Sequence, residues 1–313
     1  MVGPEKGPVV TVLLSNSGFH KACAFVEGEG RALDAALLRY NLGTGAAEAV
    51  LTALAAFQNP DGGFGHGLEP DMASPASSAL ATSVGLRLPR SIDASGSQPM
   101  VAAALAWLEK TFDWEAGVWP IITAAVDEAP HAPWWAWSKD LAENWNGFRF
   151  NPSAELLGYL YAYRPHVPPR LLDAAEVRMR RTIADTDVIE GAYDLKCAAR
   201  LAETPGVPDD LRQPLSELVI RSAVAHDPDD EHFPALELAP TPKSLLASPL
   251  AERIGPAADA LIAAQGEDGG WLFFWDWSFV DATAWAKAKR DWRGWLTREA
   301  IEALKAWGRV EGA

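Results

Sequence analysis

The stretch Ala53–Phe64, ALAAFQNPDGGF, decides the fold of this chain because it occurs twice. Its second copy is Ala260–Trp271, ALIAAQGEDGGW, which lies 207 residues further on. In both copies an apolar helix ends at a Gln, Gln58 or Gln265, and Asp-Gly-Gly-aromatic begins three residues later. Gly-Gly permits the positive φ with which a chain leaves a helix sharply, and the aromatic ring can then fold back on the helix end. We therefore predict two equivalent turns between packed helices, in which each Gln bonds to the backbone of the next helix.

Most of the remaining chain has apolar residues at helical spacing, in segments bounded by Pro, Gly or a short polar side chain. Ser74, Asn151 and Thr297 each precede a helix former and are predicted N-caps. Only Val9–Leu14 is β-branched enough for a strand, and a loose terminal segment over residues 1–20 is the alternative. We predict an all-α fold of about ten to twelve helices. The clearest predicted helices are Arg31–Tyr40, Ala46–Phe57, Ser77–Leu88, Pro99–Thr111, Pro152–Tyr163, Arg170–Ala184, Ile189–Leu201, Asp209–Ala225, Gly255–Ala264 and Thr297–Trp307.

The composition limits the classes of partner. The chain has 27 Lys and Arg against 42 Asp and Glu, a net charge of −15, and such a surface field repels phosphate backbones, so we expect no nucleic-acid partner. Two cysteines, Cys23 and Cys197, are too few for a disulfide framework and favour a cytoplasmic location. No apolar stretch is long enough to span a bilayer. No linker divides the chain, so we expect one domain over residues 1–313, with functional residues in the long loops Trp114–Asn151 and Asp227–Pro249.

The two Gln-x-x-Asp-Gly-Gly-aromatic segments resemble the glutamine-tryptophan repeats of the terpenoid cyclase (squalene cyclase) and protein prenyltransferase superfamily. The stretch Gln58–Leu88, which contains GHGLEPD at 65–71, is also similar to bacterial proteins labelled prenyltransferase or squalene-oxidase repeat proteins. The resemblance implies an α/α toroid, in which inner and outer helices alternate around an apolar cavity that holds an isoprenoid chain. It implies an apolar small-molecule substrate and no cofactor, with Mg²⁺ only if that substrate carries a diphosphate.

An acidic string gives the resemblance a first set of catalytic candidates. Acid-initiated terpene cyclases carry Asp-x-Asp-Asp, whose middle Asp protonates an alkene or epoxide, and Asp227-Pro228-Asp229-Asp230 matches it. The resemblance therefore implies Asp229 as proton donor, with Asp227 and Asp230 beside it. The alternative is a solvated loop at a helix end, since short acidic strings are common in a chain with 42 acids.

Two other acid motifs of the superfamily do not fit. A magnesium–diphosphate site needs Asp-Asp-x-x-Asp, but Gln213 stands where the last Asp after Asp209-Asp210 should be. Asp194 and Cys197 are three residues apart, which is not the spacing of the zinc ligands in prenyltransferases. We therefore expect no metal.

A second set of acids, Glu69 and Asp71 with His66 nearby, flanks Pro70 in a Gly-rich segment. These three residues are candidates for an acid/base set at a cavity mouth. The structural alternative is that the two carboxylates bond N–H groups at the start of the helix after Pro75.

The 14 Trp residues lie in two clusters, seven from Trp107 to Trp145 and seven from Trp271 to Trp307. Alkene protonation needs a carboxylic acid kept protonated by burial or by a neighbouring carboxylate, and aromatic faces that stabilise the resulting cations. Alternation in Trp275-Asp276-Trp277 and Trp135-Ala136-Trp137 suggests extended backbone with neighbouring rings on a common side, and packing at helix ends is the alternative. The candidate substrate-binding residues are Trp134, Trp135, Trp137, Trp271, Phe274, Trp275 and Trp277.

These features predict a terpene cyclase-like enzyme that starts cyclisation of an isoprenoid with a carboxylic acid. One alternative is a carbohydrate-active α/α-barrel enzyme, in which tryptophans hold sugar rings and two carboxylates flank the scissile bond. A non-catalytic toroid that binds a lipid or a protein is the third possibility. The carboxylate candidates for the carbohydrate enzyme are Glu69, Asp71, Asp140, Glu143, Asp276 and Asp281.

Overall fold

The computed structural model describes residues 11–138, 149–228 and 230–312. These residues form helices and connecting loops with isolated β-bridges, which confirms the all-α fold class. Within the described ranges, no helix combines the length and the apolar composition that crossing a membrane requires. The α-helices are α1 (Asn16–Glu29), α2 (Ala32–Asn41), α3 (Ala47–Leu54), α4 (Ala79–Ser91), α5 (Pro99–Thr111), α7 (Ser153–Ala162), α8 (Pro169–Ala184), α9 (Ala192–Ala202), α10 (Asp209–Ala225), α11 (Ala235–Leu238), α12 (Ala251–Ala263) and α13 (Ala282–Ala306). The 3-10 helices are η1 (Ala55–Phe57), η2 (Ala124–Glu128), η3 (Pro133–Trp135) and η5 (Arg164–His166).

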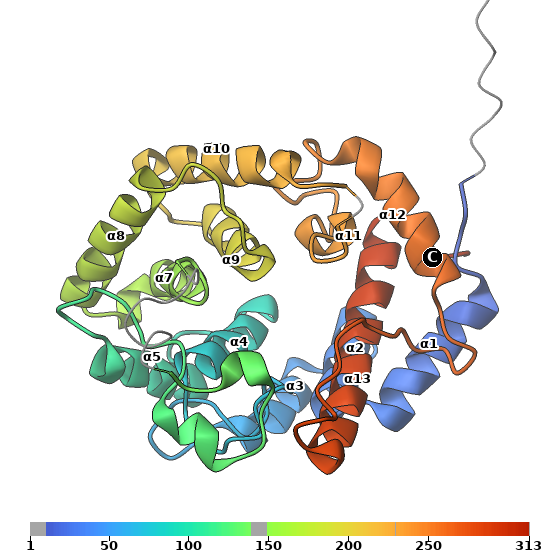
Figure 1. Ribbon diagram of the computed structural model, residues 1–313, viewed down its shortest axis with the longest axis horizontal. Coiled ribbons are helices and arrows are strands. Elements are labelled where there is room, and N and C mark those ends of the chain that lie inside the picture. Colours follow the sequence, from blue (N-terminus) through green and yellow to red (C-terminus); the bar gives the residue numbers. More distant parts are fainter. Residues whose placement is uncertain (1–10, 139–148, 229, 313) are drawn as a thin grey trace, which may run out of the picture.

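The helices follow one another around a ring (Figure 1). In this view α4, α7, α9 and α11 lie on the inner side, and α8, α10 and α12 lie outside them. The packing agrees, because α7 contacts α8 and α9, α9 contacts α10, and α11 contacts α12. The last helix, α13, packs against α1 and α2. Alternation of this kind suits an α/α toroid, and assignment to that architecture stays a prediction.

The two repeated turns have matching hydrogen bonds. Gln58 Nε2 donates to Gly62 O in its own turn and to Met100 O in α5, both at 2.9 Å. In the second copy, Gln265 Nε2 donates to Gly269 O at 3.0 Å and to Gly18 O in α1 at 2.9 Å. Each Gln therefore bonds to helix backbone, but not to the next helix as predicted: Gln58 reaches α5 rather than α4, and Gln265 reaches α1 rather than α13.

The glycines of these turns are required by their backbone conformation. Gly62 has φ 96° and Gly269 has φ 92°, a region that favours glycine. A Cβ on Gly62 would lie 2.4 Å from Ala103 O, and a Cβ on Gly269 would lie 2.5 Å from Lys21 O. The aromatic residue folds back as predicted in the second copy, where Trp271 Nε1 donates to Leu261 O of α12 at 2.7 Å. Each turn thus brings its neighbouring helices into backbone contact.

Both ends of the described chain meet at one place. Leu14 forms a parallel β-bridge with Val310, and Leu14 N donates to Arg309 O at 2.8 Å. The buried Arg309 side chain donates to Val12 O at 2.7 Å and pairs with Asp259 of α12. We call these contacts the terminal clasp, because they hold the first segment, the last segment and α12 together.

The start of the chain differs from the sequence prediction. The expected loose segment reached residue 20, but helix α1 begins at Asn16, and Ser15 caps it by accepting a hydrogen bond from Gly18 N at 3.0 Å. No strand forms among the described residues of 9–14; Leu14 makes the single β-bridge described above. The helix was missed because its apolar positions are mixed with small and polar residues.

Two predicted N-caps are wrong, and a third is displaced. Thr297 lies inside α13, which begins at Ala282 after its N-cap Asp281, and its hydroxyl instead accepts from Trp271 N at 3.1 Å. Ser74 does not cap α4; Ser78 does. Asn151 is one residue early, because the cis-linked Pro152 occupies the N-cap position of α7. In each case a tertiary contact overrides the local signal.

A small second core attaches the loop before residue 138 to the start of α13. It contains Ile121 and Trp135 from that loop and Trp277 and Trp285 from the region of α13. Both long segments that the sequence marks as loops contain short helices, namely η2 and η3 in one and α11 in the other. This second core lies against the loop that carries Glu69 and Asp71.

Candidate functional site

Glu69 and Asp71 lie on the loop between η1 and α4, and their exposed fractions are only 8% and 3%. Backbone bonds fix this acid loop: Ala132 N donates to Asp71 O at 2.8 Å, and Met72 N donates to Glu69 O at 3.1 Å. Arg31, just before α2, donates to Leu68 O at 3.0 Å. The two carboxyl groups are therefore held inside the protein by the chain on both sides of them.

The Asp71 carboxylate accepts an indole N–H, and the buried N–H groups of Trp275 and Trp292 have no hydrogen-bond partner within the described residues. Trp277 Nε1 donates to Asp71 Oδ1 at 2.7 Å. The indole N–H groups of Trp292 and Trp275 also favour its charged form. Burial disfavours the charged form, and this effect is larger than that of the indole N–H groups. The pKa of Asp71 is therefore raised to about 6.

Glu69 is the more strongly perturbed acid. Burial raises its pKa well above the ordinary range, and the charge of Asp71 raises it further, while Trp135 and Arg31 partly offset the increase. Its Oε2 atom has no hydrogen-bond partner within the described part of the chain. Burial and the neighbouring charge of Asp71 both favour the protonated form of Glu69.

The indoles continue into an aromatic wall. Trp275 meets Phe273 with ring centroids 4.1 Å apart and Trp292 edge to face at 5.4 Å. Trp292 contacts Trp295 at 5.2 Å, and the Arg31 guanidinium lies 5.3 Å from the Trp295 ring. A cation near this wall would meet several π faces.

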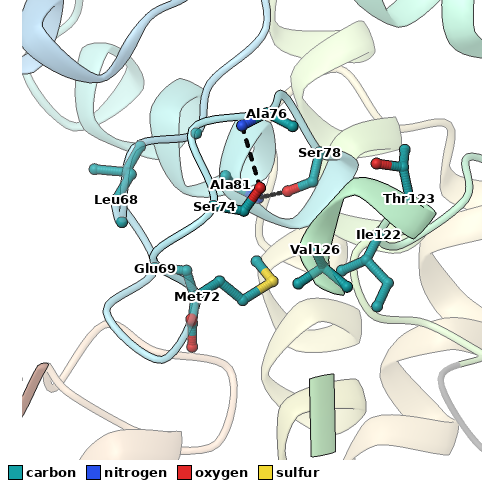
Figure 2. A pocket seen from close by; sticks show the side chains of 12 residues that line it. Leu68, Glu69, Met72, Ser74, Ala76, Ser78, Ala81, Ile122, Thr123 and Val126 are labelled. Atoms are coloured by element: carbon teal, nitrogen blue, oxygen red, sulfur yellow. Dashed lines mark hydrogen bonds between the residues drawn. The ribbon is translucent and has the colours of Figure 1, made fainter. Parts of the chain in front are cut away.

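A small hollow adjoins the acid loop, between residues 65–81 and 122–126, with a volume of about 10 Å³. That volume is room for about one water molecule. In Figure 2 the carboxyl group of Glu69 points away from the hollow, whereas the Met72 side chain points toward it.

Other carboxylates act on the same region. Tyr193 at the start of α9 is 54% exposed, yet its pKa is raised by the surrounding protein and by nearby negative charge. The groups that raise it are the carboxyl groups of Glu237 in α11, Glu299 in α13 and the acid pair itself. Carboxyl groups from three separate parts of the chain therefore raise the pKa of the Tyr193 phenol, so the surroundings of Tyr193 are rich in acids.

The other sequence candidates for catalysis lie in different surroundings. His66 is exposed, and its Nε2 lies 2.8 Å from Asn59 Oδ1. Asp227 is exposed after α10, and Asp229 lies outside the described residues. Asp230 accepts from His232 N at 2.9 Å, and this bond holds its pKa below the ordinary value. A lowered pKa is the opposite of what a proton donor at neutral pH requires.

The structure divides the aromatic candidates. Trp135 acts on Glu69, and Trp275 and Trp277 act on Asp71. The predicted extended backbone and common side are wrong for Trp135-Ala136-Trp137, because Trp135 ends the 3-10 helix η3 and is buried whereas Trp137 is exposed. The remaining candidates lie elsewhere. Trp271 packs on α12, Phe274 is exposed and contacts His232 at 4.9 Å, and Trp134 and Trp137 are 42% and 41% exposed.

Sequence reasoning missed Trp285 and Trp292 on α13 and Arg31. Trp285 and Trp292 are seven residues apart, which places them on one face of a helix. That spacing was the available signal, but the predicted helix in this part of the chain began only at Thr297. Nothing in the local sequence marks Arg31.

A second buried polar cluster lies between α4, α7 and α9. Arg87 donates to both oxygens of Glu155, at 2.6 and 2.9 Å, and Arg200 donates to Glu155 Oε2 at 3.2 Å. Burial raises the pKa of Glu155, but the two guanidinium groups prevail and hold it at about 2. Cys197 Sγ lies 3.6 Å from the same carboxylate, and burial raises the pKa of this thiol. The cluster is internally paired and is best explained as support for the three helices.

Asp194 accepts backbone hydrogen bonds from Arg149, Phe150 and Asn151, so its role is to hold the chain entering α7. Among the residues that the structure describes, no group of three or more His, Cys, Asp or Glu side chains is arranged to hold a metal ion. Comparisons with protein-family models, curated proteins and solved structures found no match to this chain.

Proposed function

We propose that this protein is an enzyme in which Glu69 protonates a carbon–carbon double bond of an apolar, isoprenoid-like substrate. The observation that carries the proposal is the Glu69 carboxyl group, which is buried, has a raised pKa and has an oxygen with no partner among the described residues. A general acid needs a carboxyl group that favours its protonated form and an oxygen that is free to contact the substrate, and Glu69 has both features.

The proposed chemistry follows from the residues around that group. The O–H bond of Glu69 breaks while the π electrons of the alkene form a C–H bond, which leaves Glu69 as a carboxylate and a cation on the adjacent carbon. The aromatic wall, with Trp275 and Trp292, stabilises that cation. A second double bond attacks the cation to close a ring, which places the positive charge on another carbon. A carbon next to that cation gives a proton to the Glu69 carboxylate, which forms a neutral alkene and restores the acid.

Asp71 has a positioning role in this scheme. Its charge, held by the Trp277 N–H, raises the pKa of Glu69 and keeps the proton there at neutral pH. Turnover is therefore expected to fall as pH rises through the pKa of Glu69. Asp71→Asn removes the charge and lowers that pKa, so the falling limb of the pH profile should move to lower pH.

The decisive experiment uses the full chain with squalene and geranylgeraniol, and cyclised products are measured by gas chromatography and mass spectrometry. Glu69→Gln is expected to reduce turnover by about 10²–10⁴-fold, the usual contribution of a general acid. Asp276→Asn is the matched control, because Asp276 is an exposed acid near the same wall. Unchanged turnover in Glu69→Gln would overturn the proposal, as would absence of any product from the unmodified chain with both substrates.

The acidic string offers a direct competitor for the role of proton donor. Asp227→Asn and Asp229→Asn are expected to retain turnover if Glu69 is the donor. Loss of turnover in Asp229→Asn, with Glu69→Gln active, would assign the donor to the string instead.

A carbohydrate-active enzyme is the second candidate, and the exposure of Trp134 and Trp137 favours it. Flat, half-exposed indoles are suited to packing against sugar rings, and Glu69 and Asp71 would be the paired carboxylates. This candidate predicts that soluble oligosaccharides quench tryptophan fluorescence and that Trp134→Ala weakens the quenching. The isoprenoid proposal predicts no such quenching.

A further inference from the structure

An open groove of about 570 Å³ lies between α1 and α13, away from the acid pair. Its walls carry four cationic and two anionic side chains, in a chain whose net charge is −15. A local cationic excess is therefore an exception on this molecule. The lining residues are Lys21, Ala24, Phe25, Gly28, Glu29, Asp268, Ala286, Lys289, Arg290 and Arg293.

The groove follows from the spacing of residues on two packed helices. On α1, Lys21, Ala24 and Gly28 recur at helical spacing, and on α13, Ala286 and Lys289 do the same. The small side chains leave space between the helices, and a Cβ on Gly28 would meet nothing within 4 Å. Long cationic side chains border that space from both helices.

Arg293 has a direct salt bridge, and the charge of Lys289 acts on nearby Asp276. Arg293 donates to both oxygens of Asp268, at 2.9 and 2.7 Å, and lies 4.5 Å from the Phe25 ring. Lys21, Lys289 and Arg290 are exposed, and their side chains form no salt bridge or hydrogen bond with any residue that the structure describes. Cations held close together repel one another, so an anion placed between them would remove an unfavourable interaction.

We propose that this groove binds a phosphate group of a small ligand. A phosphate group carries more than one charge and several acceptor oxygens, so it can engage the ammonium groups and the Arg290 guanidinium from both helices at once. A single carboxylate has too few oxygens to bridge both walls. The groove volume lies in the range of small-molecule sites, about 300–1,000 Å³. The site is independent of the proposed chemistry at Glu69.

The test uses the full chain and inorganic pyrophosphate as the probe, with binding measured by isothermal titration calorimetry at low salt. Lys289→Gln and Arg290→Gln are each expected to weaken binding at least about fivefold. Lys305→Gln is the matched control, because Lys305 is exposed on the same helix outside the groove and loses the same charge. It should change the affinity less than about twofold. Glu69→Gln should bind pyrophosphate as the unmodified chain does, which separates this proposal from the proposed function.

Two sources of the phosphate group are separated by a second measurement, co-sedimentation with vesicles of phosphatidylglycerol or phosphatidylcholine. Pyrophosphate binding without vesicle binding identifies a soluble phosphorylated ligand. Sedimentation with phosphatidylglycerol alone, lost in Lys289→Gln, identifies a lipid headgroup. If the chain binds neither probe, or if Lys305→Gln weakens binding as much as Lys289→Gln does, the groove is not a phosphate site.

Discussion

At the scale of single residues, Asp71 makes stability depend on pH. Its pKa is about 6 in the folded protein against an ordinary 3.8, so the folded state binds more protons than the unfolded state between these values. The free energy of unfolding should therefore fall as pH rises from about 4 to about 6, by about 3 kcal/mol. Asp71→Asn should lack this fall and be more stable than the unmodified chain at pH 7.

Urea unfolding of both proteins at a series of pH values provides the measurement. The difference between the two curves is the readout, because Asp194, whose pKa is also raised to about 6, titrates in both. The two proteins should converge near pH 4. If the two free energies of unfolding differ by the same amount at every pH, ionisation of Asp71 does not destabilise the folded state.

Glu155 behaves in the opposite way, because it is the shared partner of two guanidinium groups. Glu155→Leu leaves the partly exposed Arg87 and Arg200 without their buried carboxylate, which should cost about 2–4 kcal/mol of unfolding free energy. Glu109→Leu, which breaks the more exposed pair with Arg170, should cost less than about 1 kcal/mol. Equal losses in thermal unfolding would contradict the assignment of Glu155 as a structural centre.

Among the elements, a glycine can be required for two reasons: its backbone has a positive φ, or a neighbouring backbone leaves no room for a Cβ. Gly43 has φ 75° with nothing within 4 Å of an added Cβ, whereas Gly269 has both positive φ and a backbone contact at 2.5 Å. Gly43→Ala should therefore cost about 1–2 kcal/mol, the ordinary penalty of that conformation. Gly269→Ala should cost more, because α1 must also move away. Chemical denaturation of the two variants checks this order, and an equal cost would mean that the contact with α1 is easily relieved.

The repeated turns also show what the sequence can predict. The backward fold of Trp271 onto α12 depends on residues close together in the chain and was predicted correctly. The Gln bonds between helices reach Met100 and Gly18, which are 42 and 247 residues away, and the helices that they reach were not predicted. The start of α13 was not predicted correctly. Asp281 is its N-cap, but the many tryptophans that follow obscured the helical spacing of its apolar face. The Glu69–Asp71 pair was chosen from sequence, but its partner Trp277 lies 206 residues away from Asp71. Contacts of that separation are set by the packing of the whole ring.

At the scale of the whole molecule, the terminal clasp should control the stability of α1. Arg309 joins Val12, Gly255 and Asp259 from a buried position. Arg309→Met removes these bonds to a charged donor, so hydrogen exchange in α1 should accelerate, with a loss of about 1–3 kcal/mol. Arg170→Met, on the surface, is the control. Equal exchange in α1 for both variants would show that α1 is held by α13 alone.

The terminal clasp has a further consequence for the order of the chain. Gln58 links its turn to α5, and Gln265 links the equivalent turn to α1 across the point where the two ends meet. The place where the two ends of the chain meet therefore has the same Gln contact as an ordinary junction between helices, although no peptide bond crosses it. A circular permutant, with residues 312 and 11 joined by a short linker and new termini opened at the exposed Gly43–Thr44 bend, should therefore fold to the same ring.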